Sequence, residues 1–151
     1  MAADRPEPVL GDSLKPRLPF EFVIFGTAVS AQGSAASIAA WKKRVTDAAR
    51  AALPEGSWLL SDPLAVTIYI FPKGLMQGDL DNRLKPLLDA MVRCVYDDDR
   101  LVERIVAQKF EPGRQFAFAD PGEALLGALA SEDPNVDIRL SDDFGEDRSD
   151  G

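Results

Sequence analysis

Two short segments near the middle of the sequence carry closely spaced aspartates. Asp79 and Asp81 are separated by one residue, and Asp97-Asp98-Asp99 follow after an apolar segment. If the chain around Asp79 is extended, alternate side chains point the same way, so Asp79 and Asp81 can converge on one ion. Mg²⁺ prefers an octahedral oxygen shell made of a few carboxylates and retained waters. The spacing therefore indicates a metal-dependent catalytic site, with a third carboxylate supplied by residues 97–99.

The absence of histidine limits the chemistry open to such a site. It excludes imidazole acid–base catalysis, Ser–His and Cys–His nucleophiles and nearly every usual zinc site. An EF-hand is also excluded, because its sixth and twelfth positions counted from Asp79 are Leu84 and Ala90 rather than Gly and Glu. A phosphatase of the Asp-x-Asp type is disfavoured by the polar loop before Asp79. A solvated acidic turn remains an alternative for residues 97–99.

Lys85 and Asp89 follow Asp81 at steps of one helical turn. Lys85 could contact a scissile phosphate or pair with the carboxylates of a metal site. It could equally form an i,i+4 ion pair with Asp81 or Asp89, worth a few tenths of a kcal/mol. Asn82 is either a helix-start residue or a group that orients a ligand carboxylate. The spacing alone leaves these alternatives open.

A helix is expected to begin at Asp81 or Asn82 and to run to about Val95. Its apolar residues recur with helical spacing, at Leu84, Leu87, Leu88, Met91, Val92 and Val95. Burial of that face against a sheet would fix the distance between the two acidic segments. Pro86 falls in the first turn, where its missing N–H costs little.

The remaining segments predict an α+β domain, in which a small mixed sheet is covered by two main helices. Strands are expected over 19–26, 63–71, 101–110 and, as an edge strand, 135–140, with a short strand over 116–118. Helices are expected over 35–53, capped by Ser34 or Ser37, and over 121–130, with Asp120 as N-cap.

Charge is unevenly distributed along the 151 residues, whose formal net charge is −8. The part through Arg114 carries 15 basic and 15 acidic residues, and the remainder carries 2 basic and 10 acidic residues. We expect a flexible lead-in at 1–18, one folded domain at 19–140 and a disordered acidic tail at 141–151. A neutral body with an acidic cluster leaves surplus positive charge elsewhere, for example on the 35–53 helix, which is compatible with nucleic acid.

Cys94 is the only cysteine, so no intrachain disulfide can form and a reducing cytoplasm is expected. Its spacing places it beside the apolar face of the helix as a packing residue. The first 18 residues lack the apolar run of a signal peptide, and no segment is long enough to cross a bilayer.

Residues 19–111 resemble the RusA-like Holliday junction resolvases. The resemblance rests on Asp79-Leu80-Asp81-Asn82, on Lys85 and Asp89 at four-residue steps, and on Asp98-Asp99 before Leu101-Val102. The strand–helix–strand order before the motif is also similar to that of the family. The composite motif is fairly specific, whereas Asp-x-Asp alone would not be.

The resemblance implies a homodimeric, Mg²⁺-dependent endonuclease that cleaves branched DNA, with Mn²⁺ as an alternative ion. By the same resemblance, Asp79, Asp81 and Asp99 are the catalytic metal ligands, Asp98 is the neighbouring candidate ligand, and Lys85 is the catalytic lysine. With no histidine, activated water is the natural nucleophile. A two-fold dimer suits symmetric nicking of two strands.

Three features depart from the family pattern. The loop 73–78 contains a single lysine, residues 113–134 look like an insertion, and the acidic tail is additional. Phosphate contacts dominate DNA affinity, so a weakly basic loop bears on DNA binding more than on metal chemistry. The alternative function is a catalytically weak or inactive relative that binds DNA or protein, with the tail as a regulatory mimic of the phosphate backbone.

Overall fold

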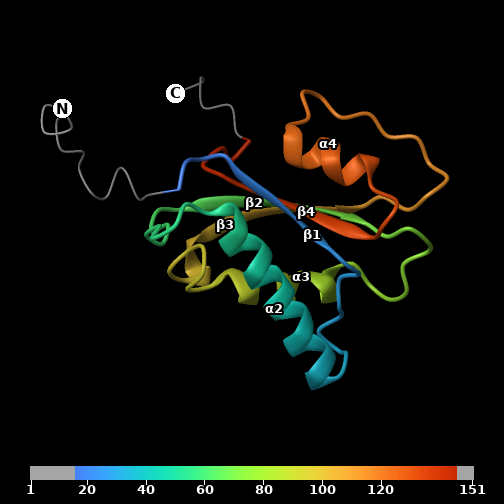
Figure 1. Cartoon of the computed structure of the whole chain (residues 1–151), viewed down its shortest axis with the longest axis horizontal. Helices are drawn as coiled ribbons and strands as arrows, with labels where there is room; N and C mark the ends of the chain where they lie inside the picture. The colour runs from blue at the N-terminus through green and yellow to red at the C-terminus, as the bar shows by residue number, and fades with distance from the viewer. Residues whose placement is uncertain (1–15, 146–151) are drawn as a thin grey trace, which may run out of the picture.

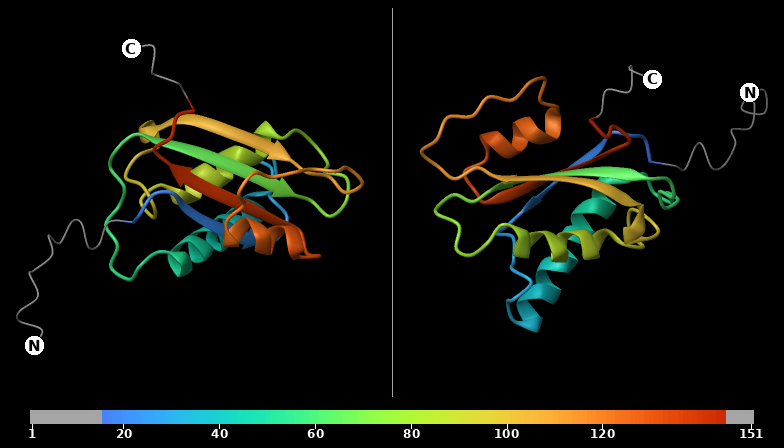
Figure 2. Two further views of the ribbon diagram at one scale, coloured as in Figure 1. Left: turned by 90° about the horizontal axis from the view of Figure 1, so that it is seen from above. Right: turned by 180° about the vertical axis from the view of Figure 1, so that it is seen from behind.

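The computed structural model describes residues 16–145 and shows one four-stranded sheet between two helical layers (Figure 1). The strands are β1 (Phe20–Phe25), β2 (Leu64–Phe71), β3 (Val102–Lys109) and β4 (Asn135–Ser141), in the spatial order β1-β4-β2-β3. β2 and β3 are parallel, whereas β4 is antiparallel to both of its neighbours. Viewed from above, β1 and β3 form the two edges (Figure 2). The expected mixed sheet of an α+β domain is confirmed.

The larger core lies between the sheet and the helices α2 (Ala35–Ala52) and α3 (Leu84–Met91). Alternate residues of β1, β2 and β4 point into it because successive strand side chains face opposite sides. These buried residues are Phe20, Phe22, Ile24, Leu64, Val66, Ile68, Ile70, Val136, Ile138 and Leu140. The helix α2 contributes Trp41, Val45 and Ala49 at helical spacing. Its predicted cap is confirmed, since the Ser34 hydroxyl accepts from the Ser37 N–H at 3.1 Å.

A second, smaller core lies on the opposite face of the sheet, under α4 (Glu123–Ala130). It contains Phe71, Phe110, Leu125 and Ala128, with Tyr69 and Phe118 packed against it. Figure 2 shows α4 and the segment before it on one side of the sheet, with α2 and α3 on the other. Both faces of the central strands are therefore covered.

The helix after Asp81 is shorter than predicted. A 3₁₀ turn, η2 (Asp81–Arg83), leads into α3, which ends at Met91 rather than near Val95. Arg93 has a positive φ of 64°, and the chain then turns back so that the Leu60 N–H donates to the Val95 carbonyl at 2.9 Å. The apolar period continues past Met91 because Val95 and Tyr96 are buried in the same core without being helical.

Three other predictions were wrong in detail. The strand β4 is central rather than at an edge, because it pairs with β1 along one side and with β2 along the other. Residues 116–118 form no strand, and the ring of Phe118 packs against the smaller core. The helix α4 begins after Gly122 rather than after Asp120, which has a positive φ of 46°.

The described part of the chain leaves out most of the predicted lead-in and part of the predicted tail. Residues 1–15 of the expected lead-in and 146–151 of the expected tail lie outside the described part of the chain. Ser141 is the last residue of β4, and the Asp143 carboxylate accepts from the Gly145 N–H at 2.8 Å. Within residues 16–145, no helix is both long and apolar enough to span a membrane.

Truncating Leu87 to alanine is expected to destabilise the fold by about 2–5 kcal/mol, because this α3 side chain is fully buried between helix and sheet. The measurement is the free energy of unfolding in urea. Leu75→Ala is the matched control, since Leu75 is 80% exposed and should cost less than about 0.5 kcal/mol. Equal costs for the two variants would contradict the placement of α3.

Candidate active site

A pocket of about 310 Å³ lies between α3 and the start of β3. It is lined by Asp81, Leu84, Lys85, Leu88, Asp89, Tyr96, Asp99, Val102 and Ile105. The polar members come from two segments that are separated in the sequence by the core-forming residues of α3. The pocket is thus where the structure brings the two predicted acidic segments together.

Asp81 and Asp99 both line this pocket and come from two separate turns. Asp81 begins η2, directly before α3, and Asp99 begins η3 (Asp99–Leu101), directly before β3. Both side chains are solvent-exposed. Burial of Leu87 and Met91 holds α3 on the sheet, and it thereby fixes the spacing of the two carboxylates.

Asp98 has a different role from its neighbour. It is the N-cap of η3, and its carboxylate accepts from the Arg100 N–H at 2.9 Å and from the Arg100 side chain at 3.3 Å. The backbone hydrogen bond from Arg100 and a side-chain hydrogen bond with Asp99 hold the pKa of Asp98 below its usual range. Asp98 is therefore engaged in closing its own turn, whereas Asp99 lines the pocket.

Lys85 pairs with Asp89 rather than with Asp81 in this structure. Its Nζ lies 3.2 Å from Asp89 Oδ1, and Lys42 of α2 lies 3.9 Å from Asp89 Oδ2. The Lys85 side chain is 72% exposed, so this i,i+4 pair contributes only a few tenths of a kcal/mol. The ammonium group can therefore exchange Asp89 for a phosphate at little cost.

Tyr96 forms the floor of the pocket. Its ring is fully buried, and its hydroxyl donates to the Leu88 carbonyl at 2.9 Å. Burial, followed by the negative charges of Asp99 and Asp89, raises the pKa of Tyr96 well above its usual value. The hydroxyl is thus a fixed, protonated donor that ties the turn before Asp99 to α3.

Asp79 does not line this pocket. It lies on an exposed loop, and residues before it in this loop are hydrogen-bonded to the rest of the fold. The Met76 N–H donates to Glu111 at 2.9 Å, and Arg83 donates to the Gln77 carbonyl. Within residues 16–145, no three acidic, histidine or cysteine side chains are grouped closely enough to hold a metal ion together.

Arg83 and Tyr96 are the site-building residues that the sequence did not predict. The Arg83 side chain is buried and also donates to the Ala28 carbonyl, so it joins the loop after β1 to the loop before Asp79. Asn82 ties the loop after β1 to η2 through its backbone, since its carbonyl accepts from the Ala31 N–H at 2.7 Å. Only the position of Arg83 inside the acidic motif could have drawn attention to it.

An α+β fold that brings carboxylates and a lysine around an open pocket suits a hydrolase acting on phosphodiesters. Comparison with family models matches residues 27–116 to the family described as endodeoxyribonuclease RusA. The match covers more than half of the chain and contains every predicted site residue, so the chain belongs to the RusA family of endodeoxyribonucleases. A search of curated proteins found no match.

Proposed function

We propose that this protein is a Mg²⁺-dependent endonuclease that resolves branched DNA by attack of water on a phosphodiester. The observation that carries the proposal is the pocket shared by Asp81, Lys85 and Asp99. Lys85 lies in α3, and the two aspartates lie in the turns before and after it. Membership of the RusA family supplies the class of reaction. The fold supplies the residues that would perform it.

The residues of the pocket fit a hard divalent cation. Asp81 and Asp99 offer exposed carboxylate oxygens, and Mg²⁺ typically binds through one or two carboxylates while it retains waters. Asp79, on the adjoining loop, and Asp98 are the further candidate ligands. A divalent ion would supply charge stabilisation at the phosphate and activation of water. Mn²⁺ accepts similar oxygen ligands and is expected to substitute.

Lys85 is proposed to bind the phosphate group undergoing cleavage. Its ammonium group stands at the rim of the pocket and is held only by an exposed ion pair with Asp89. Asp89 in turn keeps the lysine over the pocket when DNA is absent. Tyr96 and Arg83 position the carboxylates through the backbone and do not act on the substrate themselves.

The DNA backbone is proposed to run across α2 and α3 on this face of the molecule. Lys42 reaches Asp89 from α2, and Lys43 on the next position is 77% exposed. Phosphate contacts from such lysines would supply affinity without sequence selectivity. A homodimer would present two such sites to the two strands of a four-way junction.

The test is cleavage of a labelled four-way junction beside a linear duplex of the same sequence, with Mg²⁺ or with EDTA. The expected result is paired nicks in the junction, little cleavage of the duplex and no cleavage without the metal. An Asp81→Asn preparation run in parallel detects contaminating nucleases. Binding of the junction without cleavage would instead favour an inactive, DNA-binding relative, and equal cleavage of junction and duplex would contradict selectivity for branched DNA.

A further inference from the structure

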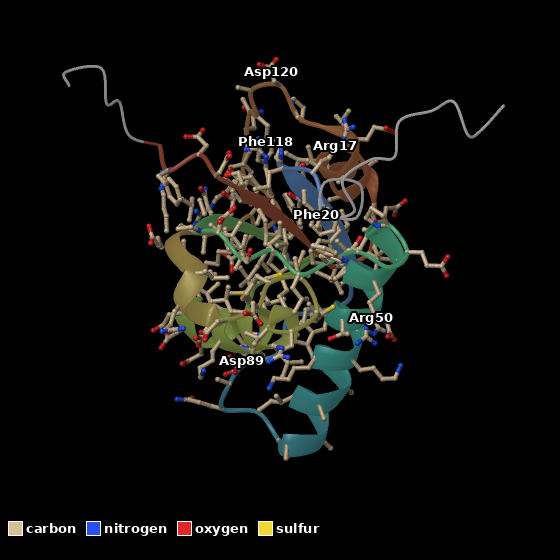
Figure 3. The ribbon with its side chains drawn as sticks, turned by 90° about the vertical axis from the view of Figure 1, so that its left-hand side faces the viewer. Arg17, Phe20, Arg50, Asp89, Phe118 and Asp120 are labelled. Atoms are coloured by element: carbon tan, nitrogen blue, oxygen red, sulfur yellow. The ribbon has the colours of Figure 1, made fainter. Side chains whose placement is uncertain are left out.

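A second pocket, of about 610 Å³, lies on the opposite face of the sheet from the candidate nuclease site. Its floor is the face of β1, β2 and β4 that points away from α2 and α3, and its wall is the segment 117–122 with the start of α4. Figure 3 shows Phe118 and Asp120 on one side of the sheet and Asp89 on the other. Neither the candidate site nor the RusA motif accounts for this pocket.

Asp137 is an unusual residue for the floor of a pocket. It lies in the centre of β4, is only 2% exposed, and its Oδ1 has no hydrogen-bond partner among the described residues. A buried carboxylate oxygen without a donor costs free energy. A donor group from a ligand in the pocket would recover that cost.

Glu21 stands beside Asp137 on the same face of the sheet. Its partner in the register is Arg139, so it lies diagonally across from Asp137. Burial, and then the hydrogen bond and charge of Glu21, raise the pKa of Asp137 to about 9. Asp137 therefore keeps its proton at neutral pH, because a buried carboxyl group beside a second carboxyl group is costly to ionise.

Aromatic rings cover the side of the pocket next to these carboxylates. Tyr69 is the partner of Asp137 in the register with β2, and its ring centroid lies 5.7 Å from that of Phe118. Both rings line the pocket. A planar cation can hydrogen-bond to two carboxylates with its edge while its face packs on such rings, a combination for which guanidinium is better suited than ammonium.

We propose that this pocket binds a guanidinium group, carried by a small organic cation or by an arginine side chain, with Asp137 and Glu21 as acceptors and Tyr69 and Phe118 as the stacking surface. A metal ion is the less suitable occupant, because within residues 16–145 no three potential ligands are grouped for one. The neighbouring Arg139 is exposed and gives Asp137 Oδ1 no hydrogen bond. The volume is in the range of small-molecule sites.

Binding is coupled to a proton. The charged or titratable groups that line the pocket with Asp137 are Glu21 on β1, Tyr69 on β2, Arg139 on β4 and Asp120 before α4, while α4 itself contributes the apolar Leu125. Of these, the charges of Glu21 and Arg139 act on the pKa of Asp137. A guanidinium group favours the ionised form of Asp137, so its binding should release the proton that Asp137 holds. Affinity should therefore increase as the pH rises from 6 towards the pKa of Asp137, at about 9.

The experiment is isothermal titration of the full chain with butylguanidinium and with its neutral analogue butylurea. Butylguanidinium should bind at least about tenfold more tightly than butylurea, and its affinity should be higher at pH 8.5 than at pH 6.5. Proton release on binding is detected by comparing two buffers of different ionisation heat. N-acetyl-arginine amide tests whether the guanidinium group can be that of an arginine side chain. If this compound also binds, the pocket can accept an arginine side chain of a partner protein. If only butylguanidinium binds, the ligand is a small free cation.

Asp137→Asn should lose this binding, whereas Asp133→Asn is the matched control, because Asp133 is exposed and lies outside the pocket. Thermal unfolding of both variants checks that they are folded. Phe118→Leu provides a second variant. It should weaken the binding of butylguanidinium while Asp137 and Glu21 are unchanged. Absence of binding to the wild type, equal binding of butylurea, or undiminished binding to folded Asp137→Asn would overturn the proposal.

Discussion

Replacing Asp99 by asparagine is expected to lower the rate of junction cleavage by about a hundredfold or more, whereas Asp98→Asn should retain cleavage within about tenfold. Asp99 lines the pocket with Asp81, and Asp98 accepts the hydrogen bonds that close the η3 turn. A metal ligand contributes several kcal/mol to the transition state, and each 1.4 kcal/mol is a factor of about ten in rate. Asp81→Asn should match Asp99→Asn.

Substitution by asparagine allows the roles of Asp98 and Asp99 to be compared without disturbing the turn. It is as good an N-cap as aspartate, so Asp98→Asn preserves the turn and removes only a charge whose partner, Arg100, is 85% exposed. Rates should be measured under single-turnover conditions with saturating protein, so that DNA affinity does not enter. Equal losses for the two variants, or a larger loss for Asp98→Asn, would contradict the assignment of Asp99 to the pocket.

The stability of the protein is expected to fall as the pH rises through neutrality, because of Asp137. Its pKa is about 9 in the folded protein, against an ordinary value of 3.8. Between these two values the folded state holds a proton that the unfolded state has released. The stabilisation is therefore fully present below about pH 4, declines with increasing pH, and is lost above about pH 9.

The slope of this decline is at most about 1.4 kcal/mol per pH unit, or roughly 2–3 kcal/mol between pH 6 and pH 8. For a chain of this size, such a change lowers the melting temperature by several degrees, at about 2–4 °C per kcal/mol. The sequence contains no histidine, so few other side chains titrate in this interval. The interval from pH 6 to pH 8 is thus well suited to observing the titration of Asp137 alone.

The measurement is the melting temperature in buffers from pH 6 to pH 8, for the wild type and for Asp137→Asn. The asparagine variant should lose the slope, because it has no proton to release at this position. Asp133→Asn, with an exposed carboxylate, should retain it. A wild-type melting temperature that stays constant, or rises with pH, would contradict a buried, protonated Asp137.

Much of the fold could be predicted because periodicity and local signals agreed. The strand from Leu64 to Phe71 was predicted to within one residue, and the 35–53 helix carries both a serine cap and a buried stripe. The predicted edge strand was the main error. An alternating pattern such as that of 135–140 indicates one apolar face, but it cannot indicate that strands pair along both edges of β4.

Less of the site could be predicted. The spacing of Asp81, Lys85 and Asp89 was informative because helical steps place them along one surface. Asp98 and Asp99 differ in role because Asp98 caps η3 and Asp99 is left to line the pocket. If η3 began one residue later, the two roles would be exchanged, and the sequence does not fix that position. Arg83 and Tyr96 act through contacts with Gln77 and Leu88, whose carbonyl positions only the folded chain defines.

The most direct test of the proposed metal site is the location of Mn²⁺ in crystals of the protein, identified by its anomalous scattering. One principal peak is expected in the pocket between α3 and β3, within coordination distance of Asp81 and Asp99, at about 2.0–2.3 Å from their carboxylate oxygens. The position of Asp79 relative to that peak would show whether its loop supplies a third ligand. A principal peak bound by Asp98 without Asp99, or no peak in this pocket at saturating Mn²⁺, would contradict the proposed metal site.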